Sequence, residues 1–163
     1  MERKILLIPL ALLILSIIMP TMAEANSTTY LEAEMQITRS VLIGPVKGKV
    51  KGTQYDFYFE GIVGGPNVIG TIEGVDHYIF DLDGIGHIDA YATITDKDGD
   101  IIKSHVTGLN PPGNPSGAYY PFVDAEATVT GATGKYLTLV GSTFRVEGFF
   151  SDLNRLHMVW YYP

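Results

Sequence analysis

The sequence predicts an all-β fold: a single antiparallel β-barrel, closed or nearly closed, with about eight or nine strands after an N-terminal apolar segment. Short stretches of alternating polar and apolar residues recur along the chain, separated by turns that contain glycine. No window after Asn26 shows the 3.6-residue period of an amphipathic helix. A barrel is favoured over a sandwich because a domain without cysteine has no disulfides, and closure removes exposed strand edges.

The first 25 residues resemble a secretory signal peptide. A short, partly basic start is followed by an apolar run from Ile5 to Met19, and small residues lie near Ala23 and Ala25. A retained membrane anchor through residues 5–23 is the alternative, although the run is shorter than the roughly 20 residues that span a bilayer. We therefore expect a secreted or extracytoplasmic protein, with residues 1–25 as signal or anchor.

Residues 26–163 remain for the barrel domain, enough for one hydrophobic core. The whole chain has a formal net charge of −7, which argues against nucleic acid as a partner and against anionic membranes beyond an N-terminal anchor. The absence of cysteine excludes thiol chemistry and Cys-type zinc sites. Asn26 begins an Asn-Ser-Thr triplet and is a candidate glycosylation site. The sequence does not determine the oligomeric state.

The strands of the first half follow from the alternation. Residues 31–37 predict a half-buried strand, and residues 40–52, which are rich in glycine and lysine, predict a connector or a short edge strand. Residues 55–59 form a strand with aromatic groups on both faces. Residues 68–73 and 77–82 predict two short strands separated by Gly74.

The strongest local signal is a hairpin over residues 87–108. Two registers compete for it. A two-residue turn would mix polar and apolar residues on both faces. A three-residue turn ending at Gly99 pairs Ile94 with Ile102 and Ala90 with Val106, and separates the faces cleanly. We therefore expect the second register, with Gly99 in a left-handed conformation.

The second half continues the same pattern after one long loop. Residues 109–117 contain three prolines and predict either a lid over one barrel mouth or a surface connection. Residues 122–130, 140–150 and 153–162 predict the last strands.

Residues 129–148 contain a glycine-rich turn, in which Gly131, Thr133, Gly134, Lys135 and Tyr136 precede Gly141. This stretch resembles the corresponding turn of the allene oxide cyclase and dirigent barrels, with Ala132 in place of a second glycine. Residues 55–108 are similar in their turns to an uncharacterised family of small barrels of that fold. The resemblance implies a calycin-like barrel with a central cavity, but no complete cyclase or dirigent active-site pattern is present.

A cluster of polar residues on the central strands is the candidate for acid–base chemistry. In the chosen register Tyr91 and His105 are cross-strand neighbours, and Asp89 lies one step along the same face. A carboxylate, an imidazole and a phenol within reach of each other would move a proton if they were desolvated. Ordinary polar residues on the wet face of a sheet are the favoured alternative. We therefore list Asp89, Tyr91 and His105 as catalytic candidates, and these three with Asp76 and Tyr78 as ligand-binding candidates.

Other motifs predict no metal and no cofactor. Asp96, Asp98 and Asp100 are spaced like the start of a calcium loop, but the later oxygen ligands are missing, and a hairpin turn explains the Asp-Gly pair. The four histidines lack zinc-site spacing. Aromatic residues would either fill the core or line an apolar cavity. These are Tyr55, Phe57, Tyr58, Phe59, Tyr78, Phe80, Tyr91, Trp160 and Tyr161.

The sequence thus favours an exported barrel that binds a small, largely apolar ligand or serves as a structural surface module. The alternative is an isomerase or cyclase of the allene oxide cyclase or dirigent kind, which would orient a reactive substrate in the barrel. The direction of the Asp89, Tyr91 and His105 face distinguishes them. A closed, partly polar cavity around this face favours the enzyme, and exposure to solvent argues against it.

Overall fold

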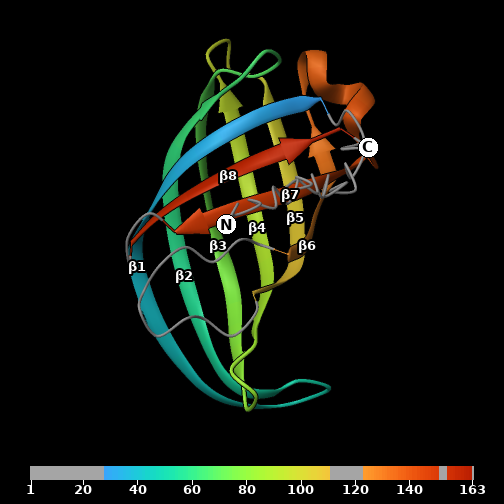
Figure 1. Ribbon diagram of the computed structural model, residues 1–163. Coiled ribbons are helices and arrows are strands. Elements are labelled where there is room, and N and C mark those ends of the chain that lie inside the picture. The colour runs from blue at the N-terminus through green and yellow to red at the C-terminus, as the bar shows by residue number, and fades with distance from the viewer. Residues whose placement is uncertain (1–27, 111–122, 151–153, 163) are drawn as a thin grey trace, which may run out of the picture.

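The computed structural model describes residues 28–110, 123–150 and 154–162 (Figure 1). The expected signal segment, the Asn26 triplet and residues 111–117 of the expected loop lie outside these described residues. The described elements are one short 3-10 helix, η1 (Gly134–Leu139), and eight strands: β1 (Thr29–Lys47), β2 (Lys51–Gly64), β3 (Gly70–Asp81), β4 (Gly86–Asp96), β5 (Ile101–Asn110), β6 (Val123–Ala132), β7 (Thr143–Phe150) and β8 (Arg155–Tyr161).

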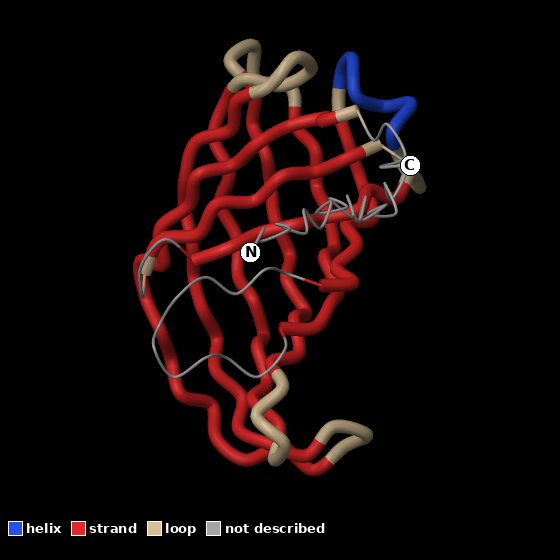
Figure 2. Tube along the Cα trace, viewed as in Figure 1, coloured by secondary structure: helices blue, strands red, loops and turns tan. Residues whose placement is uncertain are grey.

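The eight strands form one closed antiparallel barrel. Each strand pairs with the next in the sequence, and β8 pairs with β1 to complete the ring. Figure 2 shows that strands make up almost the whole described chain, with η1 at one end of the barrel. The prediction of an all-β antiparallel barrel is therefore confirmed. None of the helices in the described ranges has the length and apolar character needed to cross a membrane.

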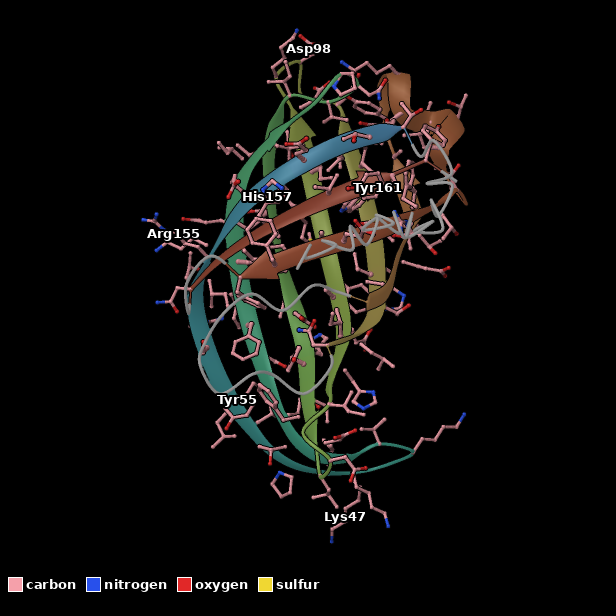
Figure 3. All side chains as sticks on the ribbon, in the orientation of Figure 1. Lys47, Tyr55, Asp98, Arg155, His157 and Tyr161 are labelled. Carbon is pink, nitrogen blue, oxygen red and sulfur yellow. The ribbon has the colours of Figure 1, made fainter. Side chains whose placement is uncertain are left out.

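The central hairpin has the expected register. Ile94 pairs with Ile102 and Ala90 pairs with Val106, and Gly99 adopts a φ of 88° in the turn. Side chains on one face of this hairpin are buried in the core, whereas the other face carries half-buried and exposed groups. The turn between β4 and β5 marks what we call the upper end of the barrel, where Figure 3 shows Asp98.

Several of the expected strand boundaries are wrong. Leu109 and Asn110, expected in the long loop, belong to β5, and the strand expected from residue 140 begins at Thr143. Residues 40–47 continue β1 and pair with β2, so that this stretch is part of a long hairpin. Residues 70–81 form one strand that passes through Gly74 without a break. A Cβ at Gly74 would lie 2.6 Å from Cζ of Phe59 and 2.1 Å from the Tyr91 carbonyl oxygen. Glycine is required here by close packing and does not interrupt the strand.

The barrel has a closed upper part and a longer sheet below it. The β1–β8 pairing ends at Gln36 and Arg155, whereas β1 and β2 continue to pair down to Lys47 and Lys51. Figure 1 shows β1 to β5 extending well below β7 and β8. We call this extension the lower sheet; Figure 3 shows Tyr55 on it and Lys47 at its lower end.

The hydrophobic core fills the closed upper part. Its largest fully buried side chains are Trp160, Phe144, Leu31, Ile72, Ile94 and Ile102, contributed by six different strands. The Phe144 ring contacts Trp160 and also Tyr30 and Tyr162, with centroid distances of 4.8 to 5.7 Å. Burial of these groups supplies the main driving force for closing the ring.

The glycine-rich turn that carries the family resemblance closes the upper end. Lys135 Nζ lies 2.5 Å from the Asp96 carboxylate, and the Tyr136 hydroxyl donates a hydrogen bond to the same group at 3.1 Å. The backbone N–H groups of Asp98 and Asp100 also donate to Asp96. The ion pair with Lys135, first among these contacts, holds the pKa of Asp96 well below its usual range. This motif therefore has a structural role, because it ties η1 to the β4–β5 turn.

Asp96→Asn is expected to lower the melting temperature by roughly 3–6 °C at neutral pH. The amide keeps the size of the carboxylate but removes the charge that pairs with Lys135 and the strong acceptor for two backbone N–H groups. Differential scanning calorimetry measures the effect. Asp98→Asn, on the exposed side of the same turn, is the matched control and should shift the melting temperature much less. Equal shifts in the two variants would contradict the structural role of Asp96.

Candidate functional site

Four aromatic rings lie together on the inner face of the lower sheet. They belong to Tyr55 and Phe57 on β2 and to Tyr78 and Phe80 on β3, and we call them the aromatic quartet. The register of the two strands places these residues on the face that is continuous with the core, because Tyr55 pairs with the buried Tyr78. The two-residue period of a strand places Tyr55 and Phe57 on one face of β2, and Tyr78 and Phe80 on one face of β3.

Each ring of the quartet contacts two others. The Tyr55 and Phe57 rings are stacked 5.8 Å apart, and the Tyr78 and Phe80 rings meet edge to face at 4.7 Å. Two cross-strand contacts, from Tyr55 to Phe80 and from Phe57 to Tyr78, complete the set. Only Tyr78 is buried: Tyr55 and Phe57 are half-buried, and Phe80 is 45% exposed. An apolar surface therefore remains accessible on the inner face, below the closed ring.

Asp76 lies on the same inner face, beside the quartet. It pairs with Phe57 on one side and with Ala90 on the other. Its Oδ1 accepts a hydrogen bond from the backbone N–H of Asp89 at 3.0 Å. Burial raises the pKa of Asp76 to about 7, because desolvation disfavours the charged carboxylate and outweighs that hydrogen bond. The negative charges of Asp89 and Asp56 act in the same direction as burial, while His77 opposes it.

A buried amide completes the polar part of this surface. The Asn110 Nδ2 group donates a hydrogen bond to the Tyr78 hydroxyl at 3.1 Å, and burial raises the pKa of Tyr78. Asn110 Oδ1 is buried and has no hydrogen-bond partner among the described residues. Gly86 lies beneath the Tyr78 hydroxyl, since a Cβ there would come within 1.6 Å of that oxygen. Glycine at this position is therefore needed for the Tyr78 ring to lie across β4.

The three catalytic candidates lie on the opposite, outer face of the barrel. The Tyr91 and His105 rings are stacked at 4.5 Å, and His105 Nε2 donates a hydrogen bond to Asp89 Oδ1 at 2.5 Å. Tyr91 is 48% exposed, and the Asp89 and His105 side chains are 51% and 33% exposed. The expected neighbourhood is present, but solvent reaches it, and a proton-transfer site needs groups that are shielded from water.

Each of the four histidines on the outer face is hydrogen-bonded to a carboxylate on a neighbouring strand. Beside the pair already described, His77 Nδ1 lies 2.8 Å from Asp56, His87 Nε2 lies 2.8 Å from Asp81, and His157 Nδ1 lies 2.6 Å from Glu34. The hydrogen bond from His77, as the largest cause, lowers the pKa of Asp56, and that from His87 lowers the pKa of Asp81. These pairs link strands across the outer surface. Among the described residues, no group of three metal-ligating side chains comes together.

The five ligand-binding candidates therefore divide between two faces. Asp76 and Tyr78 lie inside, and Asp89, Tyr91 and His105 lie outside. The sequence interpretation did not single out Asn110, which ends a strand directly before the proline-rich stretch and has no pattern of its own. It also did not separate the quartet from Tyr58, Tyr91 and Tyr161, which alternate to the outer face. The registers between neighbouring strands make that separation.

The fold and this inner surface define a small β-barrel protein with a partly polar aromatic wall. Neither a protein-family model nor a curated protein sequence matches the chain. Solved structures do resemble it. A β-barrel-like protein from Acinetobacter baumannii has a TM-score of 0.66 at 14% identity, and the match covers 83% of this chain and 94% of that one.

Two further structures give the same result. A protein of unknown function from Clostridium acetobutylicum has a TM-score of 0.68 at 19% identity, covering 83% of this chain and 95% of that one. A conserved protein of unknown function from Rhodopseudomonas palustris has a TM-score of 0.62 at 15% identity, with the same coverage of 83% and 95%. At these identities the likeness shows the fold alone. It supports a small barrel but not the allene oxide cyclase or dirigent family specifically.

Proposed function

We propose that this protein binds a small, largely apolar ligand against the aromatic quartet on the inner face of the lower sheet. The single observation that carries the proposal is the accessible aromatic surface of Tyr55, Phe57 and Phe80, placed beside the polar groups of Asp76 and Asn110. Apolar walls with a few convergent polar groups are typical of small-molecule sites. The expectation of an extracytoplasmic location, from residues 1–25, remains part of this proposal.

The isomerase or cyclase alternative has less support. It assigned catalytic roles to Asp89, Tyr91 and His105, which share the exposed outer face. A barrel that positions a reactive substrate needs its polar groups within the lumen. The inner groups, Asp76 and Tyr78, suit binding and orientation of a ligand.

Phe80→Ala is expected to weaken binding of the apolar fluorescent probe N-phenyl-1-naphthylamine by about tenfold. The substitution removes the most exposed ring of the quartet together with its contacts to Tyr55 and Tyr78. Probe fluorescence, titrated at constant protein concentration, gives the affinity.

Phe149→Ala is the matched control, because Phe149 is also partly exposed but lies on the outer face beside His157. It should leave the affinity of the probe unchanged. Equal weakening in both variants, or no saturable binding to the wild type, would contradict a site on the quartet. Native mass spectrometry of protein purified from its own host then identifies any ligand that is retained.

A further inference from the structure

Asp76 is an acidic group on the inner wall, and among the described residues it has no cationic partner. None of the described lysine or arginine side chains forms an ion pair with it. The sequence of residues 111–122 and 151–153 contains no lysine, arginine or histidine. The imidazole of the neighbouring His77 is on the other side of the wall, where it is bonded to Asp56. Asp76 is half-buried, and a desolvated carboxyl without a cation normally finds its partner in a ligand or stays protonated.

The aromatic rings around Asp76 also favour a cation. Phe57 lies directly across from it on β2, and Tyr78 follows it on the same face of β3. The faces of Phe and Tyr rings carry partial negative charge and attract cations, most strongly where water is excluded. A carboxyl beside several aromatic rings is the combination that recognises ammonium groups with apolar substituents.

The uncharged polar groups fit such a ligand. Asn110 Oδ1 is a buried acceptor without a partner in the described part of the chain, and an N–H group of a ligand would satisfy it. An anionic head group would meet the carboxyl of Asp76, and no described lysine or arginine is paired on this wall to offset that repulsion. Charge and hydrogen bonding therefore point to the same class of compound.

We propose that the barrel selects apolar organic cations, namely amines or quaternary ammonium compounds with a hydrocarbon body, and that Asp76 is the counter-ion for their charged nitrogen. The inference rests on the proposed ligand site and names the class of ligand it takes. The hydrocarbon body lies against the aromatic quartet, and the nitrogen lies between Asp76 and the rings of Phe57 and Tyr78.

The test compares three probes with the same chain length: decyltrimethylammonium, decan-1-ol and decanoate. Isothermal titration calorimetry at pH 8 should show the cation binding at least tenfold more tightly than the alcohol, with decanoate the weakest. Asp76→Asn should remove the advantage of the cation over the alcohol. Glu60→Gln removes the same charge from the outer face of β2, where Glu60 is exposed, and should retain the advantage.

The pH dependence gives a second readout. Affinity for the cation should fall between pH 8 and pH 5.5 in the wild type as Asp76 becomes protonated, while affinity for decan-1-ol stays constant. The titratable groups around Asp76 are Asp56 on β2, His77 and Tyr78 on β3, and Asp89 on β4. His77→Gln should keep the pH dependence if Asp76 is its source.

The outcomes separate the two proposals. If decan-1-ol binds as tightly as the cation, or if Asp76→Asn retains the preference, cation selection is wrong and the apolar site stands. If none of the three probes binds the wild type, both proposals are wrong. Circular dichroism spectra of the variants verify that each one is folded.

Discussion

Replacing Phe144 with alanine is expected to lower the free energy of unfolding by about 3–5 kcal/mol, the largest loss of any single truncation discussed for this barrel. Phe144 is fully buried and contacts Tyr30, Trp160 and Tyr162. Truncation removes the transfer free energy of the ring and leaves a cavity at the level where β7 completes the closed ring. Urea denaturation, followed by the fluorescence of the single tryptophan, measures the change.

Phe80→Ala is the natural comparison, since it removes the same side chain from the lower sheet. Phe80 is 45% exposed, and its loss should change the free energy of unfolding by about 1 kcal/mol or less. Each variant is thus expected to change a different property: Phe144→Ala lowers stability, and Phe80→Ala weakens ligand binding. A large loss of stability in both variants would show that the quartet is part of the core and not an exposed binding surface.

This contrast expresses how the chain divides its aromatic residues. Rings that close the upper part, such as Phe144 and Trp160, are inaccessible to solvent. Rings of the quartet pack against each other, but Tyr55, Phe57 and Phe80 keep one surface accessible, at the expense of the hydrophobic stabilisation that full burial would provide. Accessible apolar surface of this kind is typical of binding sites.

Alternation along the sequence predicted much of this arrangement, but not the direction of each face. The hairpin over residues 87–108 has strict alternation, and its register follows from keeping the isoleucines together. The same alternation placed Asp89, Tyr91 and His105 on one face without showing whether that face met solvent or the lumen. The answer depends on how eight strands close, which is a long-range property of the chain.

The inner site was harder to predict because β3 has no simple alternation. Asp76 and His77 are consecutive and both titratable, yet one faces the lumen and the other faces outward. Only their cross-strand partners separate them: Asp76 lies opposite Phe57, and His77 lies opposite Asp56. Gly74 added to the ambiguity, since a glycine within a strand is also a signal for a break. Pairing between strands, and not local pattern, assembles the site.

Asp76→Asn is expected to stabilise the protein at pH 8 and to have little effect at pH 4. The pKa of Asp76 is about 7 in the folded state, against the ordinary aspartate value of 3.8 that applies in the unfolded chain. Between these values the folded state holds a proton that the unfolded state has released, so the stability of the wild type falls as pH rises from about 4 to about 7. Asparagine does not titrate and still accepts the hydrogen bond from the Asp89 N–H.

The gain at pH 8 should be on the order of 4 kcal/mol at most, since each unit of pKa difference corresponds to about 1.4 kcal/mol. Urea denaturation of both proteins at intervals from pH 4 to pH 8.5 measures the difference. Asp56 and Asp81, whose pKa values are lowered, contribute the opposite slope, in which stability is lost as pH falls. They are present in both proteins, so that their contributions cancel in the difference.

A difference between wild type and Asp76→Asn that is constant with pH would contradict the desolvation of this carboxyl in the folded state. If the stability advantage of Asp76→Asn over the wild type grows with pH, the barrel retains a group that lowers its stability at neutral pH and above. Binding of a cation would account for such a group, because a cation beside Asp76 would lower the pKa of its carboxyl and restore the lost stability. Decyltrimethylammonium should therefore raise the melting temperature of the wild type at pH 8 more than that of the variant.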